Sequence, residues 1–217
     1  MTLLLTEIVE PPAHAEPFIV FAADRRISKA GVHAATRPKV FPVPKLRAGI
    51  GYFGLAELPG KKMDAWLSEF IGANQDASNL AEFAATLANS LNKDIPADWR
   101  RSDVSGFHLA GFTAQEKVEF WFVRNVLDDR VPTTGTFEAR EDYQREHQSK
   151  VKPGESWIYR NGDLRAHVAA WEKIDEALGT LFGFPDFRPI TTQEQYLAWT
   201  RFKFEVLCAF YEGFCSR

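Results

Sequence analysis

The region between residues 18 and 57 constrains the fold more than any other part of the chain. It opens with six apolar residues, Phe18–Ala23, and these stop abruptly at Asp24, Arg25 and Arg26. An apolar run of this length without alternation is typical of a strand that is buried on both faces. We therefore expect Asp24 at the end of a core strand, where a charge must lie at a rim or in a functional site.

A lysine and a second apolar segment follow. Lys39 comes directly before Val40 and Phe41, so its ammonium group must reach water or pair with a carboxylate. Asp24 is the obvious local candidate for that carboxylate. The sequence therefore predicts an ion pair between Asp24 and Lys39.

The next segment contains the letters of a dinucleotide-binding motif, Gly-x-Gly-x-x-Gly, at Gly49, Gly51 and Gly54. That motif requires a strand before it and a helix that begins within it, so that a phosphate meets the helix N-terminus. Here Pro59 and Gly60 interrupt the chain soon afterwards. We predict instead a strand whose glycines allow another part of the backbone to approach closely.

The spacing of apolar residues predicts the remaining elements. In chain order they are a strand over 2–9, helices beginning near 63 and 80, a hairpin of strands 106–112 and 118–124, a charged excursion over about 128–155, a helix capped by Asp163, and a helix that starts at Thr191 with Glu194 in the capping-box position. We interpret the excursion as a solvated surface segment that is partly helical.

These elements predict a single α+β domain over residues 1–217. Strands come first, two helices follow, then a hairpin and two more helices, which favours a largely antiparallel sheet covered by helix pairs. Two such sheets packed face to face would give a four-layer αββα sandwich.

Composition limits the partners and the compartment. The formal net charge is -3 with both signs mixed along the chain, so we expect no nucleic-acid partner and rather a protein, peptide or small molecule. Cys208 and Cys215 have the spacing of one helix side, which favours a reducing compartment. The first residues lack the basic start of a signal peptide and no window reaches the length of a membrane span, so we expect a cytoplasmic protein.

Other common site chemistries lack their motifs in this sequence. The five histidines show no pair at helical zinc spacing, and the two cysteines form no Cys-x-x-Cys, so we expect no metal. No Gly-x-Ser-x-Gly elbow occurs. The simplest interpretation of His108 and His167 is that they are strand and helix residues with satisfied ring nitrogens.

Three motifs in order resemble the proteasome β-subunit type of N-terminal-nucleophile hydrolase. In that family an apolar strand ends in Ala-Ala-Asp-x-Arg, a Lys-(Val/Ile) pair follows, and Gly-x-x-x-x-Gly-x-Ala-(Asp/Glu) leads into two helices. The corresponding segments here are Phe21–Arg26, Lys39-Val40 and Gly49–Glu57. The resemblance covers about the first half of the chain. It implies the αββα sandwich, assembly into a homo-oligomeric ring, a peptide or amide substrate and no cofactor.

The resemblance also implies a catalytic role for each matched residue. Removal of Met1 would leave Thr2 with a hydroxyl nucleophile and a free α-amine as its base. Lys39 would lower the pKa of that hydroxyl, Asp24 would hold Lys39, and a backbone N–H near Gly54 would bind the oxyanion.

Other interpretations of the same residues stay open. Asp24 and Lys39 could be a structural ion pair at a sheet rim, with Thr2 simply a strand residue. The chain would then be a catalytically inactive scaffold that assembles with itself or binds proteins through its Trp- and Phe-rich C-terminal helix. A third hypothesis is a monomeric, small-molecule-binding α+β domain outside the family.

Overall fold

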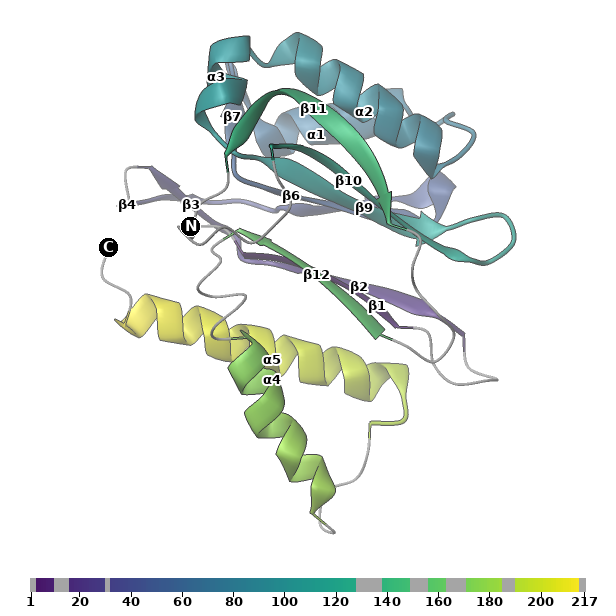
Figure 1. Cartoon of the computed structure of the whole chain (residues 1–217), viewed down its shortest axis with the longest axis vertical. Helices are drawn as coiled ribbons and strands as arrows, with labels where there is room; N and C mark the ends of the chain where they lie inside the picture. Colours follow the sequence, from purple (N-terminus) through teal and green to yellow (C-terminus); the bar gives the residue numbers. More distant parts are fainter. Residues whose placement is uncertain are drawn as a thin grey trace.

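The computed structural model describes residues 3–9, 16–29, 32–127, 138–148, 156–162, 171–184 and 190–214. It is an α+β fold in which antiparallel sheets are covered by helices, as expected from the order of the elements (Figure 1). No helix in these ranges is long and apolar enough to cross a membrane.

A three-stranded sheet contains the start of the chain. Its strand order is β12-β1-β2, and the strands are β1 (Leu3–Val9), β2 (Phe18–Ala23) and β12 (Ser156–Gly162). The prediction that Phe18–Ala23 is buried on both faces is wrong, because β2 is an edge strand in which only Val20 is buried. The central position belongs to β1, whose seven residues are all buried.

The second sheet has five strands in the order β11-β10-β9-β6-β5. These are β5 (Val40–Val43), β6 (Ala48–Phe53), β9 (Gly106–Phe112), β10 (Val118–Val126) and β11 (Ala139–Gln148). The predicted hairpin is confirmed as β9 and β10. Short elements complete the strands: β3 (Arg26–Lys29) with β4 (Val32–Thr36), β7 (Glu57–Leu58) with β8 (Lys61–Lys62), and the 3-10 turn Pro44–Leu46.

The predicted helical content of the charged excursion is wrong for residues 139–148. They form β11, a ten-residue strand that pairs with β10 through contacts such as Trp121 opposite His147. An edge strand accepts a run of charges, because one edge and one face stay in water and charge discourages pairing with another chain. Residues 128–137 and 149–155 lie outside the described residues.

Helices α1 (Met63–Ala73), α2 (Leu80–Asp94) and α3 (Ala97–Ser102) cover the outer face of the five-stranded sheet (Figure 1). The predicted cap of α2 is confirmed, since Asn79 Oδ1 accepts a hydrogen bond from the Glu82 amide at 2.9 Å. The Glu82 carboxylate accepts in turn from the Ser78 amide at 2.7 Å, one residue earlier than in the usual capping box.

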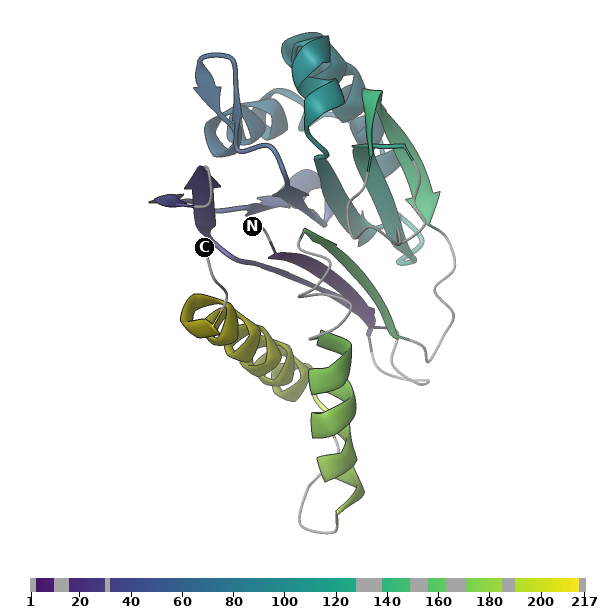
Figure 2. The same ribbon diagram turned by 60° about the vertical axis from the view of Figure 1, so that its left-hand side comes forward.

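Helices α4 (Glu172–Gly179) and α5 (Gln193–Phe214) lie on the outer side of the three-stranded sheet, with the 3-10 turn Thr180–Gly183 after α4 (Figure 2). The cap of α5 is shifted by one residue from the prediction. Thr192 Oγ1 accepts from the Gln195 amide at 3.2 Å, and Gln195 Oε1 accepts from the Thr192 amide at 3.1 Å. The predicted cap at Asp163 lies outside the described residues.

The hydrophobic core has three parts. One lies between α1, α2 and the five-stranded sheet, and includes Leu67, Phe83 and Leu109. A second lies between the two sheets, where Ile8 packs with Phe120 and Phe122. The third joins the three-stranded sheet to α4 and α5 through Leu5, Trp171 and Leu207.

The glycines of β6 let the two sheets approach each other. A Cβ on Gly49 would lie 2.6 Å from the Phe21 ring, and one on Gly51 would lie 2.6 Å from Leu4 Cδ1. Both distances are far below van der Waals contact. The predicted glycine-containing strand is therefore confirmed as β6, but the groups that approach Gly49 and Gly51 closely are side chains of Phe21 and Leu4 rather than backbone.

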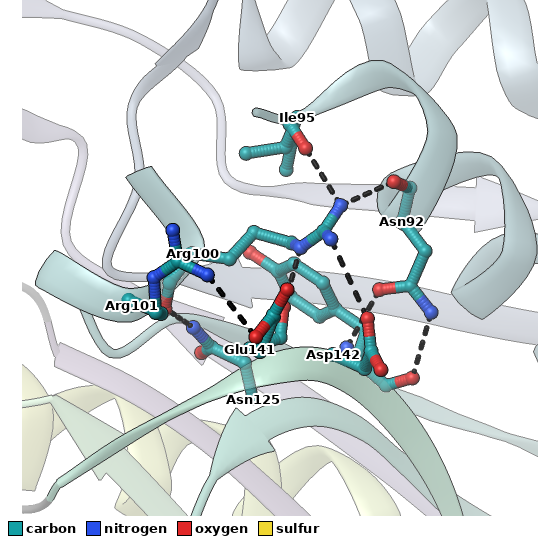
Figure 3. A network of polar contacts seen from close by, with 8 residues as sticks. Asn92, Ile95, Arg100, Arg101, Asn125, Glu141 and Asp142 are labelled. Atoms are coloured by element: carbon teal, nitrogen blue, oxygen red, sulfur yellow. Dashed lines mark hydrogen bonds and ion pairs between the residues drawn. The ribbon is translucent and has the colours of Figure 1, made fainter. Parts of the chain in front are cut away.

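Arg100 joins the end of α2, the turn that follows it and β11 (Figure 3). Its guanidinium donates to the backbone carbonyls of Asn92, Ile95 and Glu141, and it lies 3.4 Å from Asp142 Oδ1. These acceptors belong to the end of α2, to the turn that follows it and to β11. Arg100 is thus a buried connection that attaches the charged edge strand to the helices.

Candidate functional site

Asp24 and Lys39 form the predicted ion pair. The Lys39 Nζ lies 3.0 Å from Asp24 Oδ1 and 3.1 Å from Oδ2, and it also donates to the carbonyl of Arg26 at 2.7 Å. Asp24 directly follows the last residue of β2, and Lys39 directly precedes the first residue of β5. Each residue lies at a strand end, which is how segments 15 positions apart in sequence bring these two groups together.

Burial controls the electrostatics of this pair. The Lys39 side chain is 1% exposed and that of Asp24 is 14% exposed. Burial lowers the pKa of Lys39, and the charge of Asp24 and its hydrogen bond oppose that effect. A lysine with a lowered pKa is a better proton acceptor and donor near neutral pH than a solvated one.

Asp24 also binds the start of the chain. The Leu3 amide donates to Asp24 Oδ1 at 2.6 Å, and the Asp24 amide donates to the Leu3 carbonyl at 3.1 Å. The Arg26 amide donates to the other carboxylate oxygen at 3.1 Å. Each oxygen of Asp24 therefore accepts from one backbone amide and from Lys39, so the carboxylate is held in one orientation.

The other two predicted site residues, Gly54 and Thr2, are not among the described contacts of this ion pair. Gly54 follows β6 with φ +81, and a Cβ there would lie 2.3 Å from the Val104 carbonyl, so both backbone conformation and space require glycine. It is two residues from Tyr52, whose amide donates to the Lys39 carbonyl at 3.0 Å. The described contacts of Asp24 and Lys39 do not include Gly54. Thr2 lies outside the described residues.

A groove of about 520 Å³ lies beside Lys39. Its walls come from β2, from the start of β5 and from α5. The lining residues are Val20, Phe21, Ala22, Ala23, Arg25, Pro38, Lys39, Val40, Leu197, Thr200, Arg201, Phe204 and Glu205. The site thus has an apolar depression next to a buried cation, an arrangement suited to an apolar segment that carries a polar group.

A second polar cluster, which the sequence did not reveal, lies between the two sheets. Thr6 Oγ1 is 2.9 Å from His108 Nδ1, and His108 Nε2 is 2.6 Å from Asn161 Oδ1. Because the Asn161 oxygen only accepts, we assign the ring proton to Nε2, and Nδ1 then accepts from the Thr6 hydroxyl. This confirms the expectation of satisfied ring nitrogens for His108, whereas His167 lies outside the described residues.

This cluster has the residue types of a nucleophile, a base and an orienting amide, but its burial excludes a substrate. Thr6 and His108 are 0% exposed and Asn161 is 7% exposed. The rings of Phe53, Phe120 and Phe122 pack around the imidazole with centroids 5.1 to 6.2 Å away. The cluster therefore works as a polar bridge between the sheets. One sequence feature indicated this cluster, namely that Thr6 and His108 are polar residues inside largely apolar strands.

The described residues contain no cluster of side chains suited to bind a metal ion. No group of three or more His, Cys, Asp or Glu side chains is placed to hold an ion within the described ranges. Comparison of the chain with protein-family models and with curated proteins gives no match.

Proposed function

We propose that this protein is an N-terminal-nucleophile hydrolase that cleaves amide bonds, with Thr2 as nucleophile after removal of Met1. The finer architecture, an αββα sandwich of the proteasome-like type, is part of the same proposal. Three hydrophobic clusters support it, because one lies between α1, α2 and the five-stranded sheet, one between the two sheets, and one between the three-stranded sheet and α4 and α5. So do the paired Asp24 and Lys39 at the ends of two strands.

The observation that carries the proposal is the hydrogen bond from the Leu3 amide to Asp24 Oδ1. That amide belongs to the peptide bond between Thr2 and Leu3. The residue that would act as nucleophile is therefore attached directly to the group that contacts Asp24, while the same carboxylate oxygen lies 3.0 Å from Lys39 Nζ. Leu3 and Asp24 follow the pair Leu4 and Ala23 in the register of β1 and β2, and this register brings the start of β1 to the ion pair.

The chemistry follows from the groups that would meet there. A free α-amine with a pKa of about 7.7 to 8.0 is partly uncharged at neutral pH, and it takes the proton when the Thr2 hydroxyl attacks an amide carbonyl. The positive charge of Lys39 stabilises the alkoxide, and a backbone N–H near Gly54 stabilises the oxyanion. The amine returns its proton to the leaving nitrogen, and water then hydrolyses the ester formed with Thr2.

A non-catalytic assembly module is the second candidate, and a separate observation favours it. Helix α5 exposes Phe202 and Val206, which lie four positions apart on the same side of the helix, at 48% and 37%. Apolar side chains on one helix side are typical of a surface that another subunit covers. In this case the protein keeps the scaffold of a ring-forming hydrolase, and Asp24 with Lys39 only supports the fold.

Intact mass and a covalent probe separate the two functions. We expect a chain that has lost Met1 and that gains one acyl group from a β-lactone, with the group mapped to Thr2 by peptide mass spectrometry. The variants Thr2→Ala and Asp24→Asn should abolish acylation, whereas Thr2→Ser should keep it. Retention of Met1, or acylation that survives in Thr2→Ala, excludes the proposed nucleophile and leaves the assembly module.

Activity and oligomeric state complete the test. A library of fluorogenic peptide amides should be hydrolysed by the trimmed chain and not by Lys39→Ala, with Lys45→Ala as the matched surface control. Turnover that survives both Asp24→Asn and Lys39→Ala would show that the site is wrongly assigned. Sedimentation velocity then tests assembly into a ring. A monomer would contradict both candidate functions, because both assume that the chain assembles with itself.

A further inference from the structure

The outer edge of β2 carries backbone groups without a strand partner. β2 is the last strand in the order β12-β1-β2. The Asp24 amide donates to the Leu3 carbonyl, and this register turns the N–H and C=O groups of Ile19, Phe21 and Ala23 away from β1. Within the described part of the chain, no backbone hydrogen bond reaches these three residues from that side.

The groove beside Lys39 runs along this edge. It touches four consecutive residues of β2, from Val20 to Ala23, and consecutive strand residues point to opposite faces. A groove that touches all four must therefore follow the strand edge. A second hollow of about 870 Å³ shares Phe21 and Val40 with it and continues past Phe18 to Glu16.

The neighbouring edge of the other sheet is closed to a further strand. The Tyr52 amide donates to the Lys39 carbonyl, and this register turns the backbone polar groups of Val40 and Pro42 in β5 away from β6. Pro42 has no N–H, so it cannot complete a ladder, and proline is a common protection of edge strands. β2 contains neither proline nor a charged residue between Phe18 and Ala23.

Opposite charges stand beyond the two ends of β2. Exposed Glu16 precedes the strand, and exposed Arg25 follows it. Both residues line the hollows, Glu16 at the far end of the larger one and Arg25 at the end of the groove near Lys39. An added strand would therefore meet a carboxylate at one end and a guanidinium at the other.

We propose that the edge of β2 binds an extended polypeptide segment of about six residues as an added antiparallel strand. A strand rises about 3.3 Å per residue, so six residues match the length of β2. Alternate side chains of the segment enter the groove against Leu197 and Phe204 or point toward Val40. An acidic residue at its N-terminal end meets Arg25, and a basic residue at its C-terminal end meets Glu16. The proposal does not depend on the hydrolase function, because it uses neither Thr2 nor the chemistry of Lys39.

The test uses the full chain and a fluorescein-labelled peptide, Glu-Val-Thr-Val-Thr-Val-Lys, with blocked ends. Fluorescence anisotropy should show binding below about 1 mM peptide. N-methylation of both threonines and N-methylation of the valines remove backbone donors from opposite edges of the peptide. One pattern should abolish binding and the other should leave it unchanged. Equal effects of the two patterns, or no binding at about 1 mM, overturn the proposal.

Protein variants and hydrogen exchange locate the segment. Arg25→Glu should weaken binding about fivefold, and a peptide in which Lys replaces the N-terminal Glu while the C-terminal Lys is kept should recover that loss. On binding, the amides of Ile19, Phe21 and Ala23 should gain protection from exchange, while those of Val20 and Ala22 are protected already. Protection that spares β2 overturns the proposal. So does a dimer of the chain that protects the same amides without peptide, because a second copy would then be the occupant.

Discussion

The hydroxyl of Thr6 lies 2.9 Å from Nδ1 of His108, and this contact joins the central strand of one sheet to the central strand of the other. Both side chains are fully buried. A buried polar group that loses its partner keeps its desolvation cost, so the pair has large consequences for stability when only one member is replaced.

We expect Thr6→Val to lower the free energy of unfolding by about 1–3 kcal/mol, because the His108 nitrogen then loses its donor in an apolar environment. Valine keeps the shape of threonine, so packing changes little. Thr6→Ser is the control that keeps the hydroxyl. Urea unfolding of both variants provides the measurement, and a loss in Thr6→Ser without a loss in Thr6→Val would show that the methyl group, not the hydroxyl, matters.

Glycine at position 51 is required by the distance between the sheets. We expect Gly51→Ala to destabilise the fold by about 1–3 kcal/mol, because the new methyl would lie 2.6 Å from Leu4 Cδ1. Gly72 in α1 is the matched control, since a Cβ there meets nothing within 4 Å. Gly72→Ala should stabilise the protein by up to about 1 kcal/mol through helix propensity. Thermal unfolding of the two variants should therefore shift in opposite directions.

The buried and the exposed lysine pairs should differ sharply. Lys39→Met leaves the Asp24 carboxylate without its cation, and we expect a loss of about 3–5 kcal/mol in unfolding free energy. Lys45→Met removes a partner of Asp76 in a pair that is 57% and 96% exposed, and it should change stability little. Comparable losses in the two variants would contradict the burial of Lys39. The double variant Asp24→Asn with Lys39→Met should recover part of the loss.

Sequence patterns predicted local structure well and long-range partners poorly. The ion pair of Asp24 and Lys39 was predictable because a buried strand end needs a counter-charge. The partners of His108 were not, since Thr6 and Asn161 lie 102 and 53 residues away and a single sequence carries no signal for that contact. β11 was missed because its charges fit an exposed edge strand and a solvated loop equally well.

The place of Phe18–Ala23 in its sheet was also hidden from the sequence. Six apolar residues predicted a strand buried on both faces, but the fully buried strand is β1, which contains Thr6 and Glu7. Polar residues can occupy a central strand when tertiary partners bind them, as the Thr200 hydroxyl donates to Oε2 of the Glu7 carboxylate at 2.7 Å. Such partners come from elements distant in sequence, so composition alone cannot rank two neighbouring strands by burial.

Arg100 and its neighbour Arg101 offer a matched comparison. Arg100 is 8% exposed and donates to three backbone carbonyls, so Arg100→Met should leave these acceptors unpaired and cost about 2–4 kcal/mol. Arg101 is 55% exposed and pairs with Glu141, so Arg101→Met should have little effect. Hydrogen exchange adds a local readout, since only Arg100→Met should increase exchange in β11. Uniform loss of protection across both sheets would contradict a local role.

Tyr143 predicts how stability responds to alkaline pH. Burial raises the pKa of Tyr143 to about 12, whereas the unfolded side chain titrates near 10.0. Between these values the folded chain holds a proton that the unfolded chain has lost, so the contribution of Tyr143 is complete below pH 10 and disappears as the pH approaches 12. The slope from this group is at most about 1.4 kcal/mol per pH unit. Tyr143→Phe should lack that slope, while Tyr52 and Lys39 titrate alike in both proteins. Chemical unfolding of parent and variant from pH 8 to 11.5 gives the difference directly, and parallel curves would show that Tyr143 is already accessible to hydroxide in the folded state.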